Sequence, residues 1–234
     1  MTQTSVLEIK NLAKNFVLHN QGEAEIGVFA GLDLSVAPGE CVVLAGRSGV
    51  GKSTLMRAIY GNYLTQSGEI LIHDGGETLD IRRLQPRQLN RVRRSSIGYV
   101  SQFLRVIPRV PTLDLVMEPM LERGIDAAEA ESRATALLRR LNLPEGHWGL
   151  PPATFSGGEQ QRVNIARGLA VSYPLMLLDE PTASLDGDNK QVVIDLIRAR
   201  LAEGTAIIGI FHDDEVRQAL NARAFDVASY RPHH

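Results

Sequence analysis

The chain alternates short apolar runs with longer stretches in which apolar residues recur at helical spacing. Two N-terminal stretches, 6–17 and 28–36, alternate apolar with polar positions, which predicts strands with one exposed face, and Pro38-Gly39 predicts a turn after them. Three other runs are short and apolar throughout, which predicts strands that are buried on both faces of a parallel sheet. These runs are 41–45, 175–178 and 206–211.

Helical patterns separate the buried strands. The stretch 114–142 carries apolar residues three and four positions apart, as a helix with one buried face does. Further helices are predicted at 53–60, 159–171 and 189–202, and further strands at 68–72 and 97–100. Strands that alternate with helices predict an α/β fold with a mainly parallel core sheet. We expect a single domain over residues 1–234, with a helical insertion at about 103–165.

Composition narrows the class of protein. Of the 234 residues, 44% are hydrophobic and 22% are charged, which excludes a disordered or collagen-like chain. The single cysteine, Cys41, cannot form an internal disulfide, and this suits a reducing compartment. No apolar run approaches the roughly 20 residues of a membrane span, and residues 1–10 lack the pattern of a signal peptide. We therefore expect a cytoplasmic protein without direct membrane insertion.

Charge is distributed unevenly along the chain. The formal net charge of −2 gives no argument for a nucleic-acid partner. Residues 81–113, however, contain eight arginines and no acidic residue, so this segment carries +8 and the remaining chain carries −10. Such a run is usually a solvated face, and the alternative is a docking surface. The arginines are Arg82, Arg83, Arg87, Arg91, Arg93, Arg94, Arg105 and Arg109.

The strongest chemical signal is a glycine-rich turn between a predicted strand and a predicted helix. Its spacing is G-x-x-x-x-G-K-S, in which backbone N–H groups and a helix N-terminus surround a phosphate. Lys52 would reach the β- and γ-phosphates, and the Ser53 hydroxyl would bind Mg²⁺. The turn consists of Gly46, Arg47, Ser48, Gly49, Val50, Gly51, Lys52 and Ser53, and Thr54 follows as a further expected nucleotide contact.

Two carboxylates follow the apolar run 175–178. Asp179 and Glu180 fall at the carboxyl edge of the predicted sheet, where ligands of open α/β folds bind. Asp179 would bind Mg²⁺, and Glu180 would orient or deprotonate an attacking water. An acidic pair after a strand is more often a solvated turn, but the phosphate loop upstream favours the catalytic interpretation.

A third motif places a hydroxyl and two glycines at the start of the helix predicted at 159–171. This motif, Ser156-Gly157-Gly158, fits either an ordinary helix N-cap or an anion-binding helix terminus. His212 directly follows the strand predicted at 206–211. Taken alone it would be an ordinary buried or surface histidine.

The order and spacing of these motifs resemble those of an ATP-binding cassette (ABC) ATPase, from Leu7 to about Val227. The resemblance implies the ABC-type P-loop NTPase fold, with an antiparallel β subdomain and a helical insertion subdomain. It also implies ATP and Mg²⁺ as cofactors and ATP hydrolysis as the activity. The motifs that carry it are the phosphate loop, Gln102, Ser156 to Gln160, Asp179 to Thr182, Ser184 to Asp186, and His212-Asp213.

The resemblance assigns roles to further residues. Gln102 would link Mg²⁺ and the attacking water to the helical insertion, which makes Ser53, Gln102 and Asp179 the expected metal ligands. Asp186 would be the D-loop residue of the family and a further nucleotide contact. His212 would contact the γ-phosphate, so that Glu180, His212 and Gln102 form the expected catalytic set.

Two more expectations concern the surroundings of the nucleotide. Phe16 falls where the family stacks an aromatic ring on adenine, although a phenylalanine in an alternating strand is as often part of the core. In the family, the serine of the third motif faces the nucleotide of the other subunit. The resemblance therefore implies a head-to-tail dimer around two ATPs, in which Ser156 and Gly158 contact the partner's γ-phosphate. Whether the second ABC subunit is identical or a related cassette stays open.

Residues 97–109, and above all 103–109, also resemble the cassette subgroup of the bacterial carbon–phosphorus lyase pathway for phosphonate breakdown. This implies an ATPase subunit of the lyase core complex, with participation in the step that joins a ribose triphosphate to a phosphonate. Two alternatives remain: the nucleotide-binding subunit of a transporter similar to lipoprotein exporters, and an ATP-driven assembly clamp. Because Arg105 and Arg109 lie directly beyond Gln102, we expect the basic segment to dock an acidic soluble partner.

Overall fold

The computed structural model describes residues 5–18, 24–102, 104 and 109–232. Its strands form two sheets, of which one is antiparallel and one is parallel. The antiparallel sheet has the order β2 (Ala24–Val36), β1 (Leu7–Leu18), β4 (Ser67–Asp74) and β5 (Glu77–Asp80). The parallel sheet has the order β6 (Ile97–Val100), β7 (Leu175–Asp179), β8 (Ala206–Ile210), β3 (Cys41–Ala45) and β9 (Arg223–Asp226).

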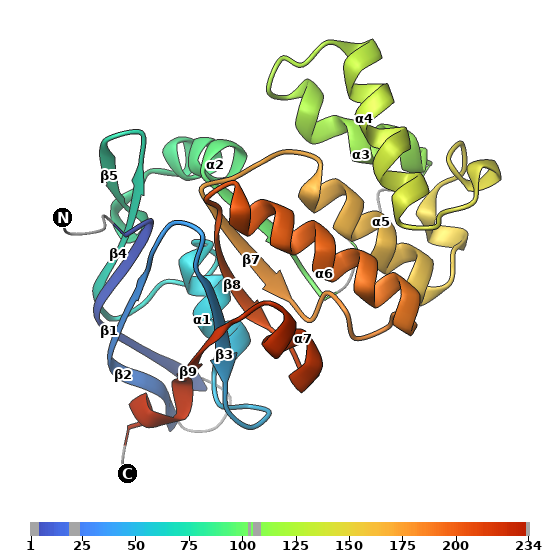
Figure 1. Ribbon diagram of the computed structural model, residues 1–234. Helices are drawn as coiled ribbons and strands as arrows, with labels where there is room; N and C mark the ends of the chain where they lie inside the picture. Colours follow the sequence, from blue (N-terminus) through green and yellow to red (C-terminus); the bar gives the residue numbers. More distant parts are fainter. Residues whose placement is uncertain (1–4, 19–23, 103, 105–108, 233–234) are drawn as a thin grey trace.

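The parallel sheet lies between two hydrophobic cores. In β3, Val42 and Leu44 belong to the core shared with the antiparallel sheet and α1 (Lys52–Ile59), whereas Cys41 and Val43 face the other core. That other core is completed by α5 (Gly157–Leu169), α6 (Gly187–Ala202) and residues of the segment 112–140, which we call the helical region. Figure 1 shows the antiparallel sheet and the helical region on opposite sides of the parallel sheet. The predicted α/β fold is therefore confirmed.

The helical region contains two helices, whereas the sequence shows one continuous helical pattern over residues 114–142. These are α3 (Thr112–Leu121) and α4 (Ala127–Arg140), and the chain between them reverses at Gly124, whose φ is 76°. Asp126 caps α4 by accepting a hydrogen bond from the N–H of Ala128. Figure 1 shows both helices standing away from the parallel sheet.

Several elements were missed by the sequence patterns because they bury few apolar side chains. The clearest case is α2 (Pro86–Ser95), in which Val92 alone is fully buried. The others are β5, β9, α7 (Asp214–Ala219) and the short 3₁₀ turns Ile81–Arg83, Glu145–His147, Pro152–Thr154 and Val227–Tyr230. Within the described ranges, no helix combines the length and apolar character needed to cross a membrane.

Candidate active site

The glycine-rich loop forms the turn from β3 into α1. Gly46, Gly49 and Gly51 have φ values of 125°, 79° and 110°, a region that side chains disfavour. A Cβ atom at Gly51 would also lie 2.5 Å from Cγ1 of Val28, so only glycine fits where the loop enters the helix. The first turn of α1 contains no acidic residue. Its partial positive charge is therefore available to an anion.

Lys52 and Ser53 open the helix that follows the loop. The Nζ atom of Lys52 donates to the carbonyl oxygens of Gly46 at 2.8 Å and Arg47 at 3.1 Å. The ammonium group of Lys52 is thus held against the loop that is expected to surround the phosphates. Ser53 and Thr54 follow in the first turn, and both side chains are half-buried.

Asp179 ends β7 and is only 5% exposed. Its Oδ2 accepts a hydrogen bond from the Tyr99 hydroxyl at 3.2 Å. Burial raises the pKa of Asp179, and the Tyr99 hydrogen bond opposes that rise. Burial, with the nearby charge of Asp179, also raises the pKa of Tyr99 to about 12. Tyr99 therefore stays protonated and acts as the donor.

Glu180 has a strained backbone. Its φ is 52°, in the left-handed region that costs a residue with a side chain about 1–3 kcal/mol. The neighbouring strand holds this conformation, because the N–H of Glu180 donates to the carbonyl of Ile210 at 3.1 Å. Strain that the surrounding structure maintains in this way is concentrated at functional sites.

Two of the predicted catalytic side chains, Gln102 and His212, meet at the carboxylate of the third, Glu180. Its Oε2 accepts a hydrogen bond from Gln102 Nε2 at 2.9 Å, and its Oε1 lies 2.7 Å from Nε2 of His212. The three residues follow β6, β7 and β8, which are neighbours in the sheet. Sheet order therefore brings together residues that lie far apart in the sequence. We call Gln102, Glu180 and His212 the catalytic cluster.

The expected metal ligands lie on one cavity. Ser53, Gln102 and Asp179 all line a cavity of about 770 Å³ beside the catalytic cluster. A hydroxyl, a carboxamide oxygen and a carboxylate are hard oxygen donors, and Mg²⁺ is commonly held by one or two carboxylates together with substrate phosphates. The donor set of this corner therefore fits Mg²⁺ with a phosphate group.

The Ser156 motif forms a helix cap whose polar groups satisfy one another. Ser156 precedes α5, and its hydroxyl and N–H both donate to Oε2 of Glu159, at 2.7 and 2.9 Å. The N–H of Glu159 in turn approaches Ser156 Oγ at 3.4 Å, which completes a capping box. These donors lower the pKa of Glu159, the Ser156 hydroxyl having the largest effect. We call Ser156 and Glu159 the signature cap.

The signature cap adjoins the loop that carries Asp186. A Cβ atom on Gly158 would lie 3.1 Å from the carbonyl oxygen of Ser184, so the start of α5 packs closely on this loop. Asp186 caps α6 and accepts the N–H of Asn189 at 2.9 Å, which lowers the pKa of Asp186. Neither of the two cavities that border the catalytic cluster is lined by residues 156–158.

Phe16 lies on β1 and is half-buried. Its ring packs against that of Tyr63 in a T-shaped arrangement at a centroid distance of 5.6 Å, and Nζ of Lys14 lies 4.4 Å from the Phe16 centroid. Tyr63 lines the same cavity as Ser53. Phe16 is therefore placed beside the cavity, and adenine stacking stays a prediction.

The structure brings the catalytic cluster and the expected metal ligands together and leaves the signature cap apart. The roles of all these residues stay predictions. Sequence reasoning missed Tyr99 and also Asn164, whose side chain on α5 donates to the carbonyl of Ser101 at 2.6 Å. Both sit in patterns of apolar positions that give no sign of a polar contact. Phe103 and Arg105, which carry part of the subgroup resemblance, lie outside the described residues.

The chain as a whole is similar to several known proteins. Residues 29–183 match the family described as ABC transporter. The ABC transporter ATP-binding protein YtrE of Bacillus subtilis is 34% identical over 213 residues, or 90% of each chain. The lipoprotein-releasing system ATP-binding protein LolD of Maricaulis maris is 39% identical over 212 residues, or 90% of this chain and 89% of the relative. A dimeric structure of MJ0796, described as a bacterial ABC transporter cassette, is 29% identical with a TM-score of 0.83 and 95% coverage of both chains.

Proposed function

Because the chain belongs to the ABC transporter family of ATP-binding cassettes, we propose that it binds ATP with Mg²⁺ and hydrolyses it at Glu180. The carrying observation is the convergence of Gln102 and His212 on the strained Glu180 carboxylate. A carboxylate held from both sides is fixed in position to orient a water and to accept its proton. Mg²⁺, when bound, would neutralise charge that develops on the phosphates.

The remaining residues of the site bind and orient the nucleotide. The phosphate loop and the N-terminus of α1 surround the phosphates, and Lys52 contributes a point charge. Ser53, Gln102 and Asp179 would hold the metal, with Tyr99 fixing the orientation of the Asp179 carboxylate.

We further propose that two chains pair head to tail around two ATPs. The signature cap lies on neither cavity that borders the catalytic cluster of its own chain. A second subunit could present Ser156 and Gly158 to the γ-phosphate instead. The similar cassette MJ0796 is described as dimeric, which supports the pairing.

The relatives favour a transporter as the partner. LolD is described as part of a lipoprotein-releasing system, and YtrE as an ABC transporter protein. On this proposal the chain is a nucleotide-binding subunit whose hydrolysis drives a membrane protein. The relatives support this candidate more than they support a lyase.

A second candidate rests on one stretch of sequence. Residues 97–109 resemble PhnL, the cassette protein of the carbon–phosphorus lyase system, and Phe103 to Arg109 carry most of that likeness. On this proposal the chain is an ATPase subunit of a phosphonate-processing complex. Participation in the ribose-triphosphate transfer belongs to this candidate alone.

One experiment separates the two candidates. The Glu180→Gln variant should bind ATP without hydrolysing it, so it should hold any ATP-dependent complex together during purification from native cells. With Mg²⁺ and ATP present, a membrane permease among the bound proteins supports the transporter. Lyase subunits from cells grown on a phosphonate support the lyase. Full phosphonate growth of cells that carry only this variant would instead favour the assembly clamp, since turnover would then be dispensable.

A further inference from the structure

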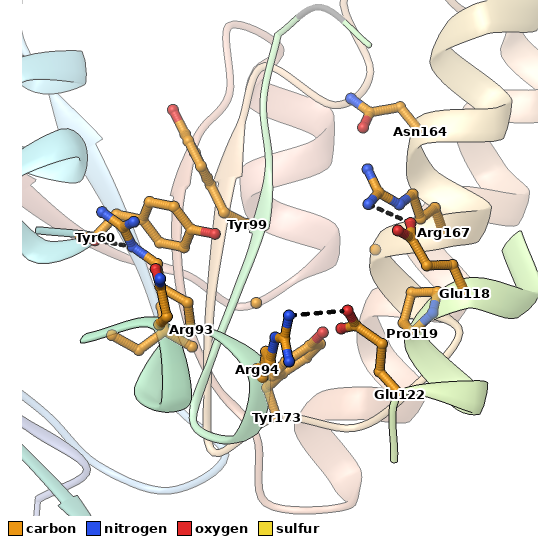
Figure 2. A pocket seen from close by; sticks show the side chains of 14 residues that line it. Tyr60, Arg93, Arg94, Tyr99, Glu118, Pro119, Glu122, Asn164, Arg167 and Tyr173 are labelled. Carbon is orange, nitrogen blue, oxygen red and sulfur yellow. Dashed lines mark hydrogen bonds and ion pairs between the residues drawn. The ribbon is translucent and has the colours of Figure 1, made fainter. Parts of the chain in front are cut away.

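Part of the basic segment is tied into the fold by contacts within the chain. Arg82 donates to two backbone carbonyls near the start of β4, and Arg83 pairs with Asp80 at 3.0 Å. Arg94 pairs with Glu122 at 3.4 Å, as Figure 2 shows. These contacts correct the expectation that the whole segment forms a docking surface. A titratable nitrogen without a hydrogen-bond partner lies elsewhere, in the turn that precedes the signature cap.

This nitrogen is Nδ1 of His147, in the 3₁₀ turn Glu145–His147. It is shielded from solvent and lies 3.3 Å from Oε1 of Glu159, yet it makes no hydrogen bond within the described part of the chain. Burying a polar nitrogen without a partner is unfavourable. The imidazole is held in place, because its ring stacks on Phe155 at a centroid distance of 4.9 Å. His147 is therefore aimed at Glu159 without being bonded to it.

The two carboxylate oxygens of Glu159 face different neighbours. Oε2 accepts the hydroxyl and the N–H of Ser156, at 2.7 and 2.9 Å, whereas Oε1 faces His147. A serine hydroxyl has only one proton to donate. While that proton is bonded to Glu159, Ser156 cannot donate it to a phosphate oxygen. The signature cap must therefore release the hydroxyl before Ser156 can bind a nucleotide as a donor.

α5, which carries the signature cap, is held by the rest of the chain beyond its first turn. Asn164 donates to the carbonyl of Ser101 at 2.6 Å. Arg167 pairs with Glu118 on α3 at 2.6 Å, and Figure 2 shows this pair. Because these contacts fix the helix, we expect the release of the hydroxyl to involve the side chains of the cap rather than a shift of α5.

A γ-phosphate at the signature cap would meet the negative charge of Glu159. Like charges at this separation repel each other strongly where water is excluded. Ser156 has the largest effect on the lowered pKa of Glu159, and smaller effects in the same direction come from His147 and Arg162. Once the Ser156 hydroxyl has turned away, a positive charge near Oε1 would both replace a lost hydrogen bond and offset the charge of Glu159.

The charged groups that face His147 come from three elements. Glu159 and Arg162 lie on α5, Glu145 begins the turn that carries His147, and Arg139 lies in the last turn of α4. Arg139 donates to Glu145 at 2.8 Å, so these two groups compensate each other. Glu159 is therefore the carboxylate that His147 can serve.

We propose that His147 is a positioning residue, which binds Glu159 when Ser156 turns to the nucleotide of the partner chain. The protonated ring donates from Nδ1 to Oε1 as a charge-assisted hydrogen bond, and the Ser156 hydroxyl is free to bind the γ-phosphate. A neutral ring can donate at Nδ1 in one tautomer only and brings no charge. Closure of the dimer therefore takes up a proton at each cap. This inference rests on the proposed head-to-tail dimer.

ATP-dependent dimerisation tests the proposal. The Glu180→Gln variant serves as the parent protein, since ATP should hold its dimer closed without turnover. Dimer dissociation constants with Mg²⁺ and ATP are measured by analytical ultracentrifugation between about pH 6 and about pH 8.5, the range in which histidine gains or loses its charge. Because the phosphates of ATP also change charge with pH, the informative quantity is the ratio of variant to parent at each pH.

Two substitutions of His147 should have opposite effects. His147→Gln cannot gain a charge, so its dimer should be roughly three- to tenfold weaker than the parent at about pH 6 and equal to it at about pH 8.5. His147→Arg keeps a charge at every pH and can still stack on Phe155. Its dimer should equal the parent at about pH 6 and be roughly three- to tenfold tighter at about pH 8.5.

His73→Gln is the matched control. His73 on β4 also lies near a glutamate, at 3.7 Å from Glu8, but far along the chain from the signature cap. Its ratio to the parent should stay near one at every pH.

Three outcomes would overturn the proposal. The first is a ratio for His147→Gln that does not change with pH, and the second is a His147→Arg protein that behaves like His147→Gln. If the glutamine variant does not fold, the arginine variant alone still decides, because a dimer no tighter than the parent at about pH 8.5 contradicts the proposal. The third is a parent protein that forms no ATP-dependent dimer at any pH. This last result would overturn the head-to-tail pairing itself, which distinguishes it from a failure of the His147 role.

Discussion

The catalytic cluster and the signature cap are both polar groups at the ends of buried elements, yet they are built in opposite ways. Glu180 is held in a strained conformation, and its carboxylate receives side chains that follow two other strands. Ser156 and Glu159 satisfy each other within one turn of helix, with no strained residue. The strained cluster lowers stability to position a carboxylate, and the cap contributes stability of its own. This difference fits the proposal that the first group is complete in one chain and the second acts on another chain.

The largest expected effect is at the catalytic cluster. Glu180→Gln removes the proton acceptor and keeps the size and hydrogen-bonding capacity of the side chain. Turnover should fall about 10²–10⁴-fold, the usual contribution of general base catalysis, while ATP affinity changes little. Steady-state ATPase assays and equilibrium binding of ATP measure the two quantities. Glu215→Gln, at an exposed glutamate of α7, is the control, and near-normal turnover in Glu180→Gln would remove Glu180 from the reaction.

The next effect tests whether the signature cap acts across a dimer. Lys52→Ala should disable the phosphate loop, and Ser156→Arg should block the signature cap, so either variant alone should lose most activity. In an equal mixture, half of the dimers are mixed and each has one intact site, so that roughly a quarter of the activity returns.

The mixing experiment also distinguishes the opposite arrangement. If Ser156 acted on the nucleotide of its own chain, each mixed dimer would still contain one defective loop and one defective cap. One of its two sites would then have the defective loop and the other the defective cap. Neither site would be intact, so mixing would restore nothing. A mixture of Lys52→Ala with Glu180→Gln, two defects of the same catalytic half-site, is the matched negative control.

A smaller effect concerns stability at the two groups. At Glu180 the positive φ favours glycine, so Glu180→Gly should be more stable than Glu180→Ala by about 1 kcal/mol. At Ser156 the lost cap should make Ser156→Ala less stable than the unmodified protein by about 1 kcal/mol. Chemical denaturation of the four proteins measures these differences. An alanine variant at position 180 as stable as the glycine variant would show that the strain is absent.

The sequence predicts features that depend on neighbouring residues, and it does not predict contacts that depend on the order of the strands. The phosphate loop and the acidic pair are local patterns, so their residues were found by spacing. The meeting of Gln102, Glu180 and His212 depends on the order of β6, β7 and β8, which no local pattern contains. Tyr99 was missed because its hydroxyl reaches Asp179 from an otherwise apolar strand. The α2 helix was missed because most of its surface is polar and Val92 alone is fully buried.

The smallest expected effect is a change in acid stability at the signature cap. The Ser156 hydroxyl lowers the pKa of Glu159, whereas burial raises that of Asp179 beside the catalytic cluster. A carboxyl group whose pKa is lowered by folding stabilises the fold at pH values above its ordinary, unfolded-state pKa. This stabilisation is lost as pH falls through the lowered pKa of the folded state. In Ser156→Ala the pKa of Glu159 should rise toward its ordinary value, so less stability is lost in acid. An NMR titration of the Glu159 carboxyl carbon measures the change. Ser156→Thr retains a hydroxyl and should keep the pKa low, and an equal pKa in both variants would mean that the backbone N–H alone holds Glu159.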